Sequence, residues 1–191
     1  MGRALLLTGR PGVGKTTVIR SAVAQLGARA GGFYTEEIRE AGRRTGFRLV
    51  ALDGPAGILA SLNVSGPCRV GRYGVHLSDL ERVGVSALWR AIRHPEVPVV
   101  VIDEIGKMEL FSPAFREAVL AGLDSPKAVL GTITMARSSW VDAVKSRPGV
   151  ILLEVTPANR STCPELILDW LQQGQGERPR DPARDGEKRP A

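Results

Sequence analysis

The chain has 191 residues, a length typical of one domain, and a domain of this size buries enough surface to fold without disulfide or metal staples. Its composition, 43% hydrophobic and 24% charged, excludes a wholly disordered chain, a collagen and a disulfide scaffold, and no apolar run approaches the ~18 residues of a membrane span. The net charge of +6 is compatible with an anionic partner, such as a nucleotide or a nucleic acid, or simply with a solvated arginine-rich surface.

The first half of the chain alternates between strand and helix patterns. Residues 4–8 form a short apolar run that predicts a buried strand, and the helical spacing of apolar residues predicts a helix at 15–26. Residues 32–40 and 46–53 predict a β-hairpin around a turn. The Gly, Pro and Ser content of residues 54–67 predicts a loop.

The alternation continues in the second half. Residues 69–76 predict a short strand, and 78–93 a helix with Ser78 as its N-cap and Glu81 three residues on. The β-branched run 99–102 has the fully apolar pattern of a central parallel strand. Further helices are predicted at 113–123, 138–145 and 160–173, and further strands at 128–134 and 150–155. Strands alternating with helices predict an α/β fold with a mostly parallel sheet.

The two ends of the chain and the cysteines bear on location and domain limits. The N-terminal residues do not resemble a signal peptide, so we expect a cytoplasmic protein without a membrane partner. Cys68 and Cys163 lack metal-ligand spacing and are predicted to be thiols rather than a disulfide. We expect a folded domain over residues 1–173 and a disordered polar tail at 174–191, because the tail has no large apolar residue to bury.

The strongest motif is the segment 9–16, Gly-Arg-Pro-Gly-Val-Gly-Lys-Thr, which matches the phosphate-binding P-loop and lies between a predicted strand and helix. The glycines let the backbone curl so that its N–H groups surround phosphate oxygens, and the N-terminus of the following helix adds positive charge. Lys15 is expected to lie near the β- and γ-phosphates, and the Thr16 hydroxyl is expected to bind Mg²⁺.

The second motif is the apolar run 99–102 followed by Asp103 and Glu104. Asp103 is expected at the carboxyl end of a central strand, where open α/β sheets bind ligands, and there it would hold Mg²⁺ through water. Glu104 is placed to orient or deprotonate an attacking water, which favours hydrolysis over nucleotide storage. The alternative for Glu104 is a carboxylate at a helix start.

Several segments resemble one family, the small P-loop nucleoside-triphosphatases first described from thermophiles, whose human member is called cancer-related nucleoside triphosphatase. They are residues 32–38, 42–47, 68–73, 101–111, 131–133 and 159–160. The resemblance implies slow Mg²⁺-dependent hydrolysis of nucleoside triphosphates to diphosphate and phosphate, with broad base specificity over ATP, GTP, CTP and UTP. It also implies a three-layer, RecA-like P-loop core, with the hairpin inserted after the first helix and an extra strand between the two motif-bearing strands.

The resemblance places the nucleotide site on two segments and implies no role for residues 134–137. The implied residues of the phosphate loop are Thr8, Gly9, Arg10, Pro11, Gly12, Val13, Gly14, Lys15, Thr16 and Thr17. Those of the second segment are Val99, Val100, Val101, Ile102, Asp103, Glu104, Ile105 and Gly106.

Hydrolysis also needs positive charge on the γ-phosphoryl group in the transition state. Lys107 and Arg160 are candidates for an internal finger, a basic side chain of the chain itself that supplies this charge. We include Lys107 with Glu104 and Lys15 among the predicted catalytic residues. The alternatives are a surface lysine at a turn and an arginine at a helix start. Thr132, at a strand tip, senses the γ-phosphate, positions water or is an ordinary residue of its strand.

The predicted hairpin leaves other functions open. It gathers basic residues beside aromatic ones, which suits single-stranded nucleic acid or a nucleotide base, although aromatics facing the core beside solvated arginines would explain the same pattern. The residues are Arg39, Arg43, Arg44, Arg48, Phe33, Tyr34 and Phe47. The alternatives to a phosphohydrolase are therefore a small nucleoside, nucleotide or polynucleotide kinase and a nucleotide-switched nucleic-acid-binding module. We expect a monomer.

Overall fold

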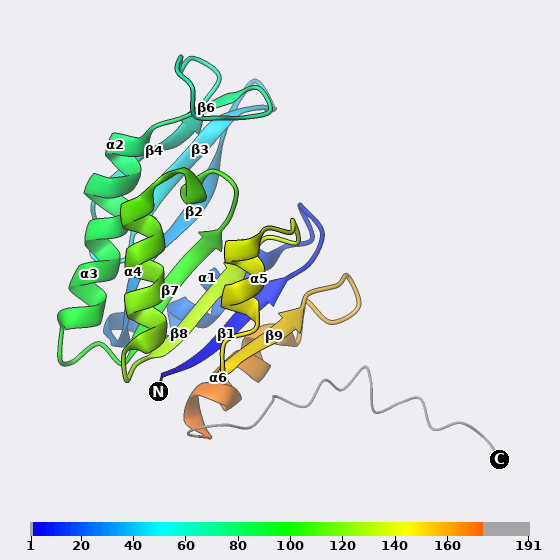
Figure 1. Cartoon of the computed structure of the whole chain (residues 1–191). Coiled ribbons are helices and arrows are strands. Elements are labelled where there is room, and N and C mark those ends of the chain that lie inside the picture. The colour runs from blue at the N-terminus through cyan, green and yellow to red at the C-terminus, as the bar shows by residue number, and fades with distance from the viewer. Residues whose placement is uncertain (1, 174–191) are drawn as a thin grey trace.

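The computed structural model describes residues 2–173, which form a sheet of nine strands with helices on both faces (Figure 1). The strands are β1 (Arg3–Thr8), β2 (Ala30–Glu40), β3 (Arg43–Ala51), β4 (Ala56–Ser61), β5 (Arg69–Val70), β6 (Tyr73–Val75), β7 (Val99–Ile105), β8 (Ala128–Ile133) and β9 (Val150–Glu154). The helices are α1 (Lys15–Leu26), α2 (Leu77–Asp79), α3 (Ser86–Arg93), α4 (Pro113–Asp124), α5 (Ser139–Lys145) and α6 (Cys163–Gln172). Short 3-10 helices form η1 (Gly27–Arg29) and η3 (Glu109–Phe111), and a π-helical stretch, η2 (Leu80–Val85), joins α2 to α3. The tail predicted at 174–191 lies outside the described residues.

The sheet has a parallel half and an antiparallel half. Its strand order is β5-β6-β4-β3-β2-β7-β8-β1-β9, and the five strands from β2 to β9 in this order are parallel. β8 lies between β1 and β7, which confirms the extra strand between the two motif-bearing strands. The predicted hairpin is β2 and β3, and it continues into β4, β6 and β5, all antiparallel. The parallel character therefore belongs to the half of the sheet that carries the motifs.

The prediction of a loop at 54–67 is wrong, because this segment contains β4, which pairs with β3. Its composition is misleading because the strand passes close under α2. A Cβ on Gly57 would lie 2.9 Å from Oδ2 of Asp79, and that carboxylate accepts a hydrogen bond from the N–H of Ile58. Leu59 and Ala60 are buried in the core. The small residues of this segment therefore allow β4 to pass close to α2, and they do not mark a turn.

Three further boundaries differ from prediction. Residues 69–76 form two short strands, because the chain reverses at Gly71, whose φ is +56°. The helix predicted from 78 begins at Leu77 without a side-chain cap, and Glu81 accepts a hydrogen bond from Ser112. The last helix begins at Cys163, so that Arg160 lies in the turn before it.

Helices bury both faces of the parallel half of the sheet. α1 and α6 pack against one face, where Leu5, Leu7 and Val101 lie. α3, α4 and α5 cover the other face, where Leu6 and Val100 lie. Because successive side chains of a strand point to opposite faces, strands covered on both sides must be apolar at every position, which explains the unbroken apolar runs.

The parallel strands bring three segments to one edge of the sheet. β1, β7 and β8 run in the same direction, so the phosphate loop after β1, the acidic pair near the end of β7 and Thr132 near the end of β8 meet at their carboxyl ends. This edge is the place where open parallel sheets bind ligands. Within residues 2–173, no helix is both long and apolar enough to cross a membrane.

Candidate functional site

The phosphate loop joins β1 to α1 through a backbone that glycines make possible. Gly9, Gly12 and Gly14 all have positive φ, at 139°, 78° and 108°. Gly9 is also sterically required, since a Cβ there would lie 2.5 Å from the carbonyl oxygen of Val155. α1 begins after Gly14 without a side-chain cap, so no side chain competes for the N–H groups of its first turn. Such a helix start attracts anions.

Lys15 and Thr16 open α1 and place their side chains at the loop. The ammonium of Lys15 donates to the carbonyl oxygens of Gly9 at 3.1 Å and Arg10 at 3.5 Å, so it lies across the loop. The hydroxyl of Thr16 faces Asp103 and favours the ionised form of that carboxylate. The first-turn residues of α1 thus point toward the acidic pair of β7.

Asp103 is completely buried near the end of β7. Its Oδ1 accepts a hydrogen bond of 2.6 Å from Oγ1 of Thr132. Its Oδ2 has no hydrogen-bond partner among residues 2–173. Burial raises the pKa of Asp103, while the hydroxyls of Thr132 and Thr16 oppose that rise. Thr132 is therefore engaged with Asp103, a role that none of the sequence-based interpretations of Thr132 included.

Glu104 follows Asp103 through a cis peptide bond, and the pairing of β7 with β8 skips from Ile102 to Ile105 around the two acids. Burial raises the pKa of Glu104, the positive charge of Lys15 lowers it, and the negative charge of Asp103 raises it again. Glu104 thus interacts electrostatically with both motifs, and it lies in a strand rather than at a helix start.

Glu109 is a third acid at this edge, and it belongs to neither of the two motifs that predict the site. It is fully buried in η3, where burial and the nearby charge of Glu104 hold its pKa well above the usual range. Gly106 lies between the two acids: a Cβ there would be 2.5 Å from Oε1 of Glu104 and 2.8 Å from Oε2 of Glu109. The sequence indicates this burial only through the apolar neighbours of Glu109, which are Met108 and Leu110.

The two candidate fingers lie on different segments. Lys107 is exposed in the turn after β7, and within the described residues its side chain has no hydrogen bond or ion pair. Arg160 is exposed in the turn between β9 and α6, and its Cδ lies 3.9 Å from the place that a Cβ on Gly14 would occupy. The structure therefore places Arg160 beside the phosphate loop, a proximity that the sequence alone does not indicate.

The hairpin has core-facing aromatics beside solvated arginines. Phe33 is buried, and Phe47 packs edge-on against Tyr73 at 5.3 Å between ring centroids. Arg39 and Arg44 form ion pairs with the same acid, Glu37. These contacts leave no row of exposed rings for bases to stack on, so they give the nucleic-acid interpretation no support.

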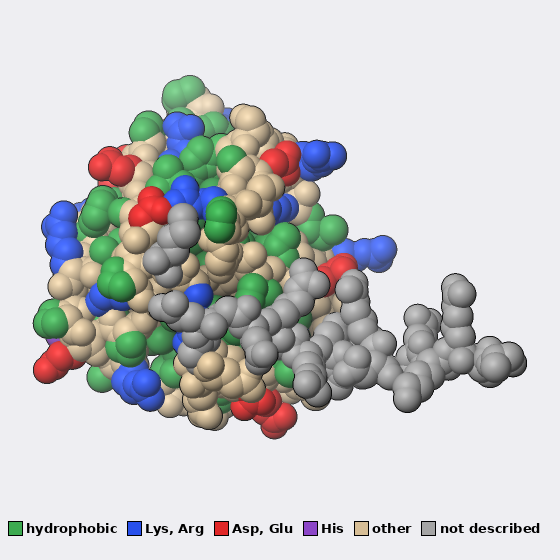
Figure 2. Space-filling model, turned by 60° about the horizontal axis from the view of Figure 1, so that its bottom comes forward, with side chains coloured by type: hydrophobic (Ala, Val, Ile, Leu, Met, Phe, Trp, Pro, Cys, Tyr) green, Lys and Arg blue, Asp and Glu red, His purple; other side chains and the backbone are tan. Residues whose placement is uncertain are grey.

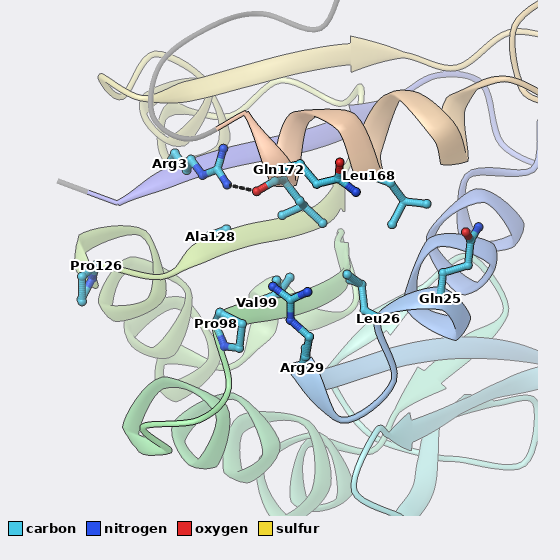
Figure 3. Close-up of a pocket in the computed structure, with 11 residues that line it drawn as sticks. Arg3, Gln25, Leu26, Arg29, Pro98, Val99, Pro126, Ala128, Leu168 and Gln172 are labelled. Atoms are coloured by element: carbon cyan, nitrogen blue, oxygen red, sulfur yellow. Dashed lines mark hydrogen bonds between the residues drawn. The ribbon is translucent and has the colours of Figure 1, made fainter.

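A cavity lies at the opposite edge of the sheet from the phosphate loop (Figure 3). It has a volume of about 540 Å³ and is lined at the strand starts by Arg3, Val99 and Ala128. Arg3 donates to the carbonyl oxygen of Leu171 at 2.6 Å. In a view turned toward this end of the molecule, lysines and arginines are spread among acidic and apolar side chains rather than gathered in one patch (Figure 2). Among the residues that line this cavity, Val99 is the one that belongs to the predicted site.

A metal ion beside the phosphate loop would have few side-chain ligands available. No group of three or more His, Cys, Asp or Glu side chains suited to a metal occurs within residues 2–173. Two oxygen donors here fit Mg²⁺, a cation that keeps several waters and takes few protein ligands. They are the buried Oδ2 of Asp103, which lacks a hydrogen-bond partner within residues 2–173, and the hydroxyl of Thr16, which faces the same carboxylate.

Comparison with known proteins agrees with this geometry. The family model described as NTPase matches residues 4–168. The nucleoside-triphosphatase THEP1 of Thermotoga petrophila is 49% identical over 173 residues, covering 91% of this chain and 95% of its own length. The human cancer-related nucleoside-triphosphatase is 42% identical over 189 residues, covering 92% and 100%.

Solved structures agree with these sequence relatives. The crystal structure of THEP1 from Aquifex aeolicus has a TM-score of 0.81 and 39% identity, covering 88% of this chain and 99% of that one. The solution structure of the human cancer-related nucleoside triphosphatase has a TM-score of 0.77, also at 39% identity, covering 92% and 100%. The chain therefore has a P-loop NTPase fold and belongs to the NTPase family, which confirms the resemblance identified from its motifs.

Proposed function

We propose that this chain is a Mg²⁺-dependent phosphohydrolase that converts a nucleoside triphosphate and water to the diphosphate and phosphate. Its relatives are named nucleoside-triphosphatases, and hydrolysis of nucleoside triphosphates by this chain follows from membership of their family. Dependence on Mg²⁺, activity on ATP, GTP, CTP and UTP alike, and slow turnover are the further parts of the proposal.

The observation that carries the proposal is the meeting of three groups at one sheet edge: the phosphate loop, the buried Asp103 with one oxygen lacking a partner, and Glu104. The loop from Thr8 to Thr17 would bind the phosphates through backbone N–H groups and the ammonium of Lys15. The second segment, from Val99 to Gly106, would form the opposite wall. A phosphate bound there would be close to both acids.

Thr16 and Asp103 would hold the metal. When bound, Mg²⁺ supplies positive charge that neutralises the phosphate oxygens. The Thr132 hydroxyl fixes the carboxylate of Asp103, so that this carboxylate is oriented before the metal arrives.

Glu104 would orient water and accept its proton. Its raised pKa makes it a better base than an exposed glutamate, provided that it is ionised, and the charge of Lys15 favours ionisation. Lys15 and Lys107 would neutralise charge on the γ-phosphoryl group. Lys107 has no other partner within residues 2–173, so its side chain is available for this role.

The test is phosphate release with Mg²⁺ from ATP, GTP, CTP and UTP, with identification of the products. Wild type should form diphosphate and phosphate from all four, and Lys15→Ala and Glu104→Gln should both be inactive. Glu117→Gln, an exposed residue of α4, is the matched control and should retain full activity. A wild type that needs a phosphate acceptor would favour the kinase alternative, and an unimpaired Glu104→Gln would remove Glu104 from the mechanism.

Two further expectations accompany this function. The chain is expected to be a monomer, which light scattering at micromolar concentration would check. Its cytoplasmic location stays a prediction from the sequence, to be tested by fractionation of cells that express it.

A further inference from the structure

The turn between β9 and α6 lies directly against the phosphate loop. The N–H of Val155 donates to the carbonyl oxygen of Thr8 at 2.8 Å. A Cβ on Gly9 would lie only 2.5 Å from the carbonyl oxygen of Val155, so this close approach requires a glycine at position 9. Residues 155–162 are thereby attached to the base of the loop that is expected to bind phosphate.

A buried asparagine holds this turn in shape. Asn159 is only 5% exposed, although it lies in a surface turn. Its Oδ1 accepts from the N–H of Thr156 at 2.8 Å, and its Nδ2 donates to the carbonyl oxygen of Glu154 at 2.9 Å. Its own N–H donates to Oγ1 of Thr156, and its carbonyl oxygen accepts from the hydroxyl of Thr162. Such a network restricts the backbone on both sides of Asn159.

Arg160 is the residue that this turn presents. Its N–H donates to the carbonyl oxygen of Thr156 at 3.0 Å, so its backbone is fixed by the same turn. Its Cδ lies 3.9 Å from the Cβ position of Gly14, the residue before Lys15. Within residues 2–173 the guanidinium has no hydrogen bond and no ion pair. A guanidinium that lies beside an anion-binding loop and forms no ion pair within the described residues is available to bind the anion of a ligand.

We propose that Arg160 is an arginine finger supplied by this chain itself: its guanidinium contacts the phosphates of the bound nucleotide and stabilises the charge that develops during hydrolysis. The proposal rests on the proposed function. In the step, the water oxygen bonds to the γ-phosphorus, and the bond from phosphorus to the bridging oxygen breaks. Its electron pair leaves on the diphosphate, and the water proton passes to Glu104. Arg160 stays protonated throughout, as guanidinium groups do in proteins.

Asn159 has a separate part in this proposal as a positioning residue. It lies too deep in the turn to reach a ligand, and its effect on hydrolysis would pass through the backbone of Arg160. Replacing it should therefore matter only while the arginine is present.

The first experiment measures kcat and KM for Arg160→Ala, Arg160→Lys and the control Arg43→Ala, an exposed arginine of the hairpin that also lacks a partner within residues 2–173. Arg160→Ala should lower kcat about a hundredfold, the effect of removing one donor from a transition-state site, with KM changed less than threefold. Arg160→Lys should recover part of the loss, since an ammonium keeps the charge but loses the planar fork. Arg43→Ala should match wild type. Arg160→Ala with kcat within twofold of wild type would overturn the proposal.

The second experiment separates the positioning role from a general loss of structure. Asn159→Ala should lower kcat, and the double variant Asn159→Ala, Arg160→Ala should be no slower than Arg160→Ala alone, because the two residues act as one unit. Multiplied losses in the double variant would refute the positioning role of Asn159.

A third measurement needs no turnover. Aluminium fluoride with a nucleoside diphosphate and Mg²⁺ mimics the transferring phosphoryl group, so it should tighten diphosphate binding to wild type and not to Arg160→Ala. Equal tightening in both would overturn the arginine finger even if hydrolysis proceeds. Tightening that depends on Arg160, in a protein that does not hydrolyse triphosphates, would support the finger and refute the phosphohydrolase.

Discussion

Thr132 donates a hydrogen bond of 2.6 Å from Oγ1 to Oδ1 of Asp103, two fully buried side chains from neighbouring parallel strands. The bond joins the end of β8 to the end of β7 and fixes one oxygen of the carboxylate. The other oxygen, Oδ2, has no partner within residues 2–173. The arrangement orients an acid that the fold has removed from water.

Thr132→Val should lower the free energy of unfolding by about 1–3 kcal/mol, because it leaves a buried carboxylate oxygen without its donor while keeping the side-chain shape. Urea denaturation at pH 7 measures this change. In a double-mutant cycle with Asp103→Ala, the two losses should not add, since each substitution removes the same bond. Additive losses would show that the hydrogen bond contributes nothing, and Thr132→Ser, which keeps the hydroxyl, is the control.

Glu109→Gln should stabilise the protein at neutral pH. Burial and the charge of Glu104 raise the pKa of Glu109 well above its usual value, so the folded state holds a proton that the unfolded state has already lost. The stability of wild type therefore falls as the pH rises from the unfolded pKa through the folded one, and the glutamine variant lacks this loss.

The difference between Glu109→Gln and wild type should be negligible near pH 4 and grow toward pH 8. For a domain of this size, each kcal/mol raises the melting temperature by about 2–4 °C. Thermal unfolding followed at several pH values provides the measurement, with Glu117→Gln as the exposed control. A pH-independent difference would contradict the assignment of a protonated, buried Glu109.

Gly106→Ala should lower kcat at least tenfold. The added Cβ would lie 2.5 Å from Oε1 of Glu104 and 2.8 Å from Oε2 of Glu109, so one or both carboxylates must move. A displaced base loses its alignment with water, and small displacements are costly in catalysis. The comparison variant is Gly122→Ala in α4, where the nearest atom would be 3.7 Å away, and which should be fully active. Equal activity of the two variants would show that the position of Glu104 is unimportant.

Lys107→Ala should lower kcat at least tenfold and leave nucleotide affinity nearly unchanged, since the proposed contact strengthens only as charge develops on the γ-phosphoryl group. Steady-state phosphate release gives kcat, and fluorescence titration with a nucleotide analogue gives affinity. A kcat within twofold of wild type would remove Lys107 from the mechanism. Lys107→Arg should retain most of the activity, because the charge is kept.

The contributions of Arg160 and Lys107 can be ranked by the same assays. If Arg160→Ala is much slower than Lys107→Ala, the main positive charge comes from the turn after β9 rather than from the turn after β7. The geometry favours this order, because Arg160 lies beside the phosphate loop, with its Cδ 3.9 Å from the place that a Cβ on Gly14 would occupy.

Local patterns were enough to predict much of this protein. The P-loop is one continuous segment whose conformation depends on its own glycines, and the apolar run ending in Asp103 and Glu104 indicates a covered parallel strand by itself. The alternation of strands and helices therefore predicted the fold class, and the resemblance of several short segments, residues 101–111 among them, predicted the family that the comparisons confirm.

Contacts between distant segments were decided only by the tertiary structure. β4 is a strand because β3 and β6 pair with it, although its own residues resemble a loop. Glu109 has an unusual proton affinity because folding places Glu104 beside it and removes water from both. Arg160 meets the phosphate loop because β9 pairs with β1, so that the turn following β9 lies beside the loop following β1. Propensity and periodicity describe a residue and its near neighbours, whereas burial, charge and proximity at this site arise from chain segments that only the folded sheet brings together.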